Sequence, residues 1–116
     1  MKSFYRPIPL VFWRGSDGSE PVRHWLWDLL EEDRKIIGRD ISRVQYGWPI
    51  GLPLCRPLGD GLWEIRSTLK SKREARVLIC FERQTLVALS AFIKKTRTAP
   101  LRELELAKSR MRDLEK

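Results

Sequence analysis

The apolar residues of this chain recur with helical spacing in its first half and with strand spacing in its second half. A short β-prone run over residues 9–13 comes first and is followed by a glycine-containing turn. A helix is predicted next, with Ser19 as its N-cap and Pro21 in its first turn. Its apolar stripe has the spacing of one helix face and consists of Val22, Trp25, Leu26, Leu29 and Leu30. A second helix is predicted over residues 32–46, because Gly47 and Pro49 follow it.

A loop rich in proline and glycine spans residues 48–61 and separates the helical half from the strand half. The segments 62–69, 75–83 and 85–94 are rich in Val, Ile, Phe and Trp, which predicts three antiparallel strands. Their connections are a turn at residues 70–74 and a tight turn at Arg83 and Gln84. A final amphipathic helix is predicted over residues 101–114.

This order of elements, β-α-α-β-β-β-α, predicts a single α+β domain over residues 1–116, since the chain is too short for two cores. We expect one small antiparallel sheet with helices on one face, namely the N-terminal helical hairpin, together with a C-terminal helix. Strand parity turns Trp63, Ile65 and Val77 toward the helices. The same parity places Arg66 and Arg76 on the other face, which is expected to be open.

The charge is basic and unevenly distributed. The net charge is +8 and the pI is about 10.0, which indicates a polyanionic partner such as nucleic acid or the ribosome. Residues 63–97 hold nine bases and three acids, whereas residues 17–40 hold seven acids and four bases. The basic surface is therefore expected on the sheet and its turns. The alternative is that these arginines are only solvated, or paired with local acids such as Glu64 or Glu82.

The turn around Ser71 has an odd length, which predicts that Arg66 lies directly across from Arg76. Like charges in this position destabilise a sheet, and an anion such as phosphate between them would remove that cost. RNA carries its own nucleophile, the 2′-hydroxyl, so a protein needs only to hold the backbone, stabilise the phosphate and move protons. The sequence is compatible with such chemistry without a metal.

Several other kinds of site are not expected. Cys55 and Cys80 stand in unrelated contexts and His24 is the single histidine, so neither a metal site nor a cofactor is predicted. The chain has no Ser–His–acid set and no glycine-rich phosphate loop. Neither a signal peptide nor a stretch of roughly 20 apolar residues is recognisable, so a cytoplasmic protein without membrane contact is expected.

Four stretches resemble the RelE/ParE superfamily of bacterial toxins, in particular its phage-related HigB-like branch. They are RPLGDGLWEIR (56–66), EARVLICFE (74–82), LSAFIKKTRTAP (89–100) and RELELAKSRM (102–111). The resemblance implies the toxin of a type II toxin–antitoxin system, an endoribonuclease that cuts mRNA in the ribosomal A site through 2′-hydroxyl attack. The implied partners are the ribosome, mRNA and a cognate antitoxin from the neighbouring gene, usually a helix-turn-helix protein.

The resemblance also implies the site residues. The basic positions of the family fall on Arg66, Arg76, Lys94 and Lys95, which are the expected catalytic residues. One departure is Glu64, since the best-known RelE members have a base at this position, and another is that no tyrosine follows Lys95. The expected RNA-binding residues are Lys70, Lys72, Arg73 and Arg97.

Two other functions remain open at this stage. A ParE-like protein would inhibit DNA gyrase by binding, without RNA chemistry. A nucleic-acid-binding protein without toxicity would use the same basic surface. An arrest of translation within minutes of induction would favour the nuclease, and early DNA-damage signalling would favour the gyrase inhibitor.

Overall fold

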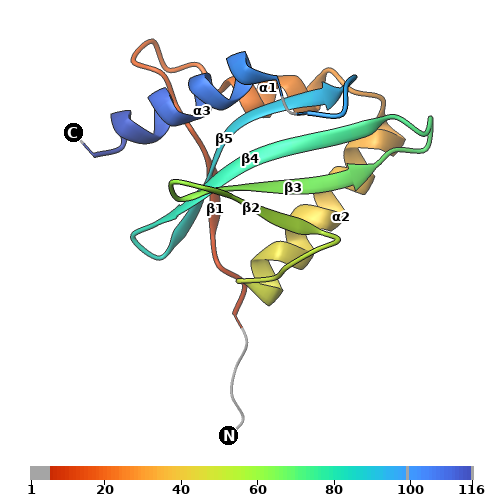
Figure 1. The fold of residues 1–116 in the computed structure, drawn as a ribbon, viewed down its shortest axis with the longest axis horizontal. Helices are drawn as coiled ribbons and strands as arrows, with labels where there is room; N and C mark the ends of the chain where they lie inside the picture. The colour runs from red at the N-terminus through yellow and green to blue at the C-terminus, as the bar shows by residue number, and fades with distance from the viewer. Residues whose placement is uncertain (1–5, 99, 116) are drawn as a thin grey trace, which may run out of the picture.

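The computed structural model describes residues 6–98 and 100–115, so part of the N-terminal segment in which no signal peptide was expected lies outside it. The described residues form an α+β fold with a five-stranded sheet (Figure 1). In chain order the elements are β1 (Leu10–Phe12), α1 (Pro21–Trp27), α2 (Glu31–Gly47), β2 (Cys55–Gly59), β3 (Leu62–Thr68), β4 (Glu74–Glu82), β5 (Thr85–Lys94) and α3 (Leu101–Asp113).

The predicted helices and strands are all present, with small shifts at their ends. The expected N-cap is wrong, because α1 begins at Pro21 and the Ser19 hydroxyl donates instead to Asp17 Oδ1 at 2.7 Å. The expected stripe is also too long, since α1 ends at Trp27 and leaves Leu30 exposed before α2. A proline at the first helical position starts a helix without a side-chain cap, because the amide it lacks is one that would have no partner within the helix.

The sheet has the order β1-β5-β4-β3-β2 and is antiparallel except at one edge, where β1 lies parallel to β5. The strand β2 lies inside the region predicted to be a loop and was not expected from the sequence. β2 pairs with β3 as the other edge strand, and it contains Pro57. An edge strand tolerates proline because its outward amide needs no partner, so a proline-rich segment could still form a strand here.

Apolar side chains form a separate core on each face of the sheet. On one face, Ile65, Val77 and Ile79 pack with Ile37 and Val44 of α2 and with α1 residues. On the other face, α3 covers one end of the sheet, where it contacts β5 and β4; Figure 1 shows α3 beside β5. The residues of this second core are Leu62, Leu78, Cys80, Val87, Leu89, Phe92 and Ala107. The expectation that the second face is open is therefore wrong at that end, since α3 lies opposite α1 and α2.

The strand register brings the two arginines together as predicted. Arg66 of β3 pairs directly with Arg76 of β4, and Ile65 pairs with Val77 on the opposite face. The β4–β5 connection is the expected two-residue turn, and both Arg83 and Gln84 have positive φ, as a type I′ turn requires. Parity and turn length therefore position the charged residues of the second face.

None of the helices within the described residues is both long and apolar enough to cross a lipid bilayer.

Candidate nucleic-acid interface

The second face of the sheet is charged beyond the end that α3 covers. We call this region the charged patch and define it as Glu64, Arg66, Thr68, Glu74, Arg76 and Lys94. Its members come from β3, β4 and β5 and share one strand parity, because Glu64 pairs with Leu78, Arg66 with Arg76 and Glu74 with both Thr68 and Lys94. The patch therefore brings together three of the four predicted catalytic residues.

The Glu64 carboxylate lies between the two opposed arginines. Glu64 Oε1 is 3.8 Å from Nε of Arg66 and 3.8 Å from Nε of Arg76, and the Glu64 side chain is buried. Neither Nε has a hydrogen-bond partner within the described residues. An anion does separate the two like charges, and it is a carboxylate of the protein. Glu64, which departs from the base of the best-known RelE members, thus compensates the charge of both arginines.

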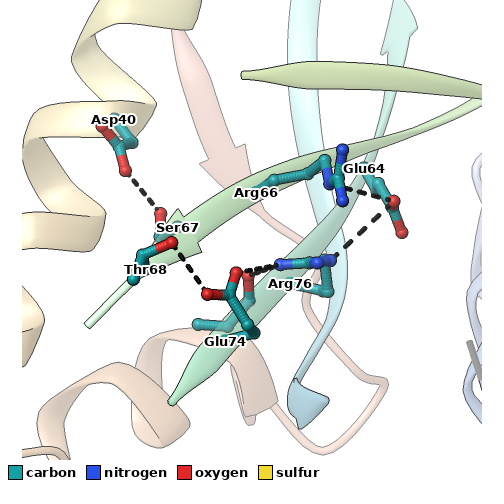
Figure 2. A network of polar contacts seen from close by, with 8 residues as sticks. Asp40, Glu64, Arg66, Ser67, Thr68, Glu74 and Arg76 are labelled. Carbon is teal, nitrogen blue, oxygen red and sulfur yellow. Dashed lines mark hydrogen bonds and ion pairs between the residues drawn. The ribbon is translucent and has the colours of Figure 1, made fainter. Parts of the chain in front are cut away.

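Arg76 is held more tightly than Arg66. The Arg76 side chain is 3% exposed, whereas that of Arg66 is 31% exposed. Arg76 Nη1 donates to the carbonyl of Ala75 at 3.0 Å and to Glu74 Oε1 at 3.3 Å, and Thr68 Oγ1 donates to Glu74 Oε2 at 2.8 Å. Figure 2 shows this chain of contacts running from Thr68 to Arg66. Arg66 is therefore the arginine that solvent or a ligand reaches directly.

The two terminal lysines of β5 differ in position. Lys94 is the last residue of β5 and lies opposite Glu74 in the register, which places it in the charged patch. Lys95 follows the strand and is exposed. The expectation that only one of the two shares the arginine face agrees with this parity, and Lys94 is the one that does.

The predicted RNA-binding residues do not form one group. In the β3–β4 turn, Arg73 Nη2 donates to the buried Asp33 at 3.0 Å and Lys70 Nζ lies 3.3 Å from Glu32, so both tie the turn to the start of α2. Lys72 is exposed in the same turn, with positive φ. Arg97 is exposed in the segment before α3, away from that turn along the chain.

A group on α2 was missed by sequence reasoning. The Asp40 side chain is buried, and its Oδ2 accepts a hydrogen bond from the Ser67 hydroxyl at 2.7 Å (Figure 2). Its Oδ1 lies 3.3 Å from Arg39 Nη2 and 3.5 Å from Arg43 Nη1. The spacing of these arginines, four residues apart on a helix, was a readable signal. A net charge count over residues 17–40 left Arg43 out, and it also hid the separation within α2 between the acids of its first turn and the arginines further along the helix.

The two cysteines and His24 lie outside the charged patch. Burial raises the pKa of Cys55 to about 11, with a further contribution from the charge of Glu64. Burial likewise raises the pKa of Cys80 to about 11, assisted by Glu82. Both cysteines are buried free thiols, and thiols of this kind react slowly. His24 lies on the surface of α1, 3.3 Å from Asp28. No group of three or more His, Cys, Asp or Glu side chains in residues 6–98 and 100–115 is placed to hold a metal ion.

Comparison with known proteins places the chain in a family. No curated protein sequence matches it. The family model described as phage-derived protein Gp49-like (DUF891) matches residues 24–112, a stretch that runs from within α1 through α2 and the strands β2 to β5 almost to the end of α3 and leaves out β1. The match includes the charged patch, the turn that follows β3 and the arginines of α2. The chain therefore belongs to the phage-derived Gp49-like (DUF891) family, a toxin-like family of the RelE type.

Proposed function

We propose that this protein is the toxin of a type II toxin–antitoxin pair and that it cleaves mRNA on the ribosome. The observation that carries the proposal is the charged patch, in which Arg66, Arg76 and Lys94 share one sheet face in a toxin-like family. We also propose that the protein belongs to the HigB-like branch and acts in the cytoplasm. Its proposed partners are the ribosome and a cognate antitoxin.

In the proposed reaction the RNA supplies the nucleophile. The 2′-hydroxyl attacks the adjacent phosphorus and gives its proton to water, and the bond to the 5′-oxygen of the next nucleotide breaks, which leaves a 2′,3′-cyclic phosphate on one fragment and a 5′-hydroxyl on the other. Arg66, the accessible arginine, contacts the scissile phosphate. Arg76 lies beneath, bound to Glu74 and next to Glu64, and holds Glu64 and Arg66 in position for that contact. Lys94 or Lys95 protonates or stabilises the leaving oxygen.

The patch is small, and this supports a dependence on the ribosome. Its exposed donors are few, because Arg76 is buried and donates to Glu74 and to the carbonyl of Ala75. A surface of this size offers little area for selecting RNA by itself. The protein is therefore expected to cut mRNA during translation and to leave the same RNA largely intact when it is naked.

The central test compares Arg66→Ala and Arg76→Ala, singly and together, with the exposed control Arg102→Ala. Loss of a preorganised charged donor costs about 10²–10³ in rate, so cleavage of ribosome-bound mRNA by the patch variants should fall by at least that factor. Cleavage is mapped by primer extension on translating ribosomes, and growth arrest is followed after induction. Thermal unfolding of each variant, with Arg76→Lys as a charge-retaining second variant, separates lost chemistry from lost folding.

Full toxicity of a folded double variant would contradict the assignment of the patch. If DNA-damage signalling then preceded the arrest of translation, a ParE-like inhibitor of gyrase would be the better description. Rapid cleavage of naked RNA would contradict the dependence on the ribosome.

The exposed basic turn has a smaller expected role. Lys72→Ala should weaken ribosome binding and lower the slope of log affinity against log salt by about 0.7, as the loss of one phosphate contact does for single-stranded RNA. Arg73→Ala should instead lower stability, because it leaves the buried Asp33 without its partner. Equal loss of stability in the two variants would remove this distinction.

A further inference from the structure

A hollow of about 350 Å³ lies beside the charged patch at the edge of β3. The first residue of β2 pairs with Ile65, so β3 beyond Arg66 has no strand on its outer side. Six of the residues around the hollow are polar: Arg39, Asp40 and Arg43 of α2, Arg66 and Thr68 of β3, and Glu74 of β4. The hollow thus joins α2 to the charged patch through Arg66, Thr68 and Glu74, which belong to both.

The two carboxylates of the hollow are already engaged by the protein. Asp40 is buried and accepts from Ser67 on one oxygen while it faces Arg39 and Arg43 with the other. Glu74 accepts from Thr68 and Arg76. The oxygens of Asp40 are therefore taken up within the protein, whereas Glu74, with a 41% exposed side chain, also faces solvent, so the three arginines and two carboxylates leave the hollow with one net positive charge.

The guanidinium groups, in contrast, keep donors available. The side chains of Arg39 and Arg43 are 63% and 58% exposed, and each guanidinium carries five N–H donors, of which the contact with Asp40 uses one or two. The buried Asp40 also holds the two side chains in one place on the helix surface. Three arginines whose remaining donors face one hollow form a site for an anion that accepts several hydrogen bonds, as a phosphodiester does.

We propose that this hollow binds a phosphate of the RNA backbone next to the scissile one, so that the RNA passes from the sheet face around the edge of β3 onto α2. The inference rests on the proposed function and adds the path of the substrate. Arg66 connects the two phosphate positions, because it lines the hollow and also lies opposite Arg76. The second half of α2 becomes part of the RNA-binding surface, whereas its first turn stays acidic with Glu31, Glu32 and Asp33.

The test measures binding without cleavage. A single-stranded RNA oligonucleotide carrying 2′-O-methyl groups throughout cannot react, and its binding to the full chain is followed by fluorescence anisotropy at several salt concentrations. The variant Arg39→Gln/Arg43→Gln is compared with Lys35→Gln/Arg102→Gln. The control removes the same two charges, from exposed positions outside the hollow.

The proposal predicts that the slope of log affinity against log salt falls by about 0.7 in the Arg39/Arg43 variant, since the hollow holds one phosphate and each neutralised phosphate of a single strand contributes about 0.7. The control should keep the slope of the wild type. A second variant, Arg39→Lys/Arg43→Lys, retains the charges and should retain most of the slope even if Asp40 is less well held. Thermal unfolding confirms that each variant is folded.

An equal loss of slope in the control would overturn the proposal, because net charge alone would then explain the binding. Absence of RNA binding by the wild type, or a preference for duplex DNA that the Arg39/Arg43 variant loses, would overturn it as well. Failure of the proposed function looks different: the wild type would bind the oligonucleotide through the hollow and yet fail to cleave translating mRNA.

Discussion

The two ends of one sheet face do different work. At one end, Leu78 and Cys80 of β4 lie under α3 in an apolar core. At the other end of the same strand and on the same face, Arg76 lies among Glu64, Glu74 and Arg66. The helix α3 covers only part of the face, and the side chains that it leaves uncovered are charged. Strand parity therefore determines which face a side chain occupies. Whether α3 covers that part of the face determines whether the side chain is apolar or charged.

The charged end is also a packed structure. Arg76 and Glu64 are as well buried there as many residues of the apolar core. The two ends differ in how the removal of one side chain lowers the stability of the fold. Removal of an apolar residue leaves a cavity, whereas removal of one ion leaves an uncompensated charge.

The largest effect is expected for Glu64→Ala. Breaking a buried ion pair costs about 3–5 kcal/mol, and here the variant leaves Arg76 buried opposite Arg66 without the carboxylate between them. Chemical denaturation should show a loss of this size, and added phosphate should restore stability in the variant more than in the wild type. Glu105→Ala, an exposed change on α3, serves as the control. An unchanged midpoint for Glu64→Ala would show that the carboxylate does not balance the arginines.

An intermediate effect is expected from the two thiols, because Cys55 belongs to the core under α1 and α2 and Cys80 to the core under α3. Both have a pKa of about 11 in the folded chain against 9.0 in an unperturbed thiol. The unfolded chain therefore ionises first, and the stability that the neutral thiols contribute is complete below pH 9 and is lost as the pH rises toward 11.

The loss should be on the order of 2 kcal/mol for each thiol. Denaturation curves between pH 8 and pH 11 should show it in the wild type. Cys55→Ala and Cys80→Ala should each remove about half of the pH dependence that the pair contributes, whatever their stability at pH 8. If one of the two variants removed the whole pH dependence, only the thiol in that core would be protected from ionisation, which would contradict the prediction.

The smallest effect is expected for Arg110→Ala, which loosens α3. Arg110 Nη1 donates to the carbonyl of Leu89 at 2.7 Å, and the guanidinium lies 4.6 Å from the ring centre of Trp13. Loss of both contacts should cost about 1–2 kcal/mol. Alkylation of Cys80 should accelerate relative to that of Cys55, and cleavage by the charged patch should not change. Faster alkylation of both thiols, or no difference from the exposed control Arg112→Ala, would contradict the prediction that the core under α3 loosens without the core under α1 and α2.

Much of this arrangement could be predicted from the sequence. Strand parity and turn length are local properties, so the pairing of Arg66 with Arg76 followed from residues 62–83. The position of α3 was misjudged although the signal was present: β4 is apolar at both parities, as a strand covered on both faces is. β2 was missed because Pro57 argues against a strand unless the strand is known to lie at an edge.

The contacts that define the site were harder to predict from the sequence. Asp40 and Ser67 are 27 positions apart and meet only when α2 packs on β3. The bond between Arg73 and Asp33 spans 40 positions and depends on the same packing. The sequence shows which arginines are present, but which of them bind acids of the protein is a property of the assembled fold.

The double burial of β4 constrains how this chain can vary and fold. Because successive residues of β4 enter different cores, a slip of one position would drive Arg76 in among Ile65 and Val44 and carry Val77 out among the carboxylates. A misaligned β4 would therefore be destabilised on both faces of the sheet at once, so that its double burial fixes the register of the strand. The edge strand β2 has a bulge between Pro57 and Gly59 and mostly exposed residues. Substitutions should accordingly be tolerated better in β2 than in β4, because the register of the sheet depends on β4.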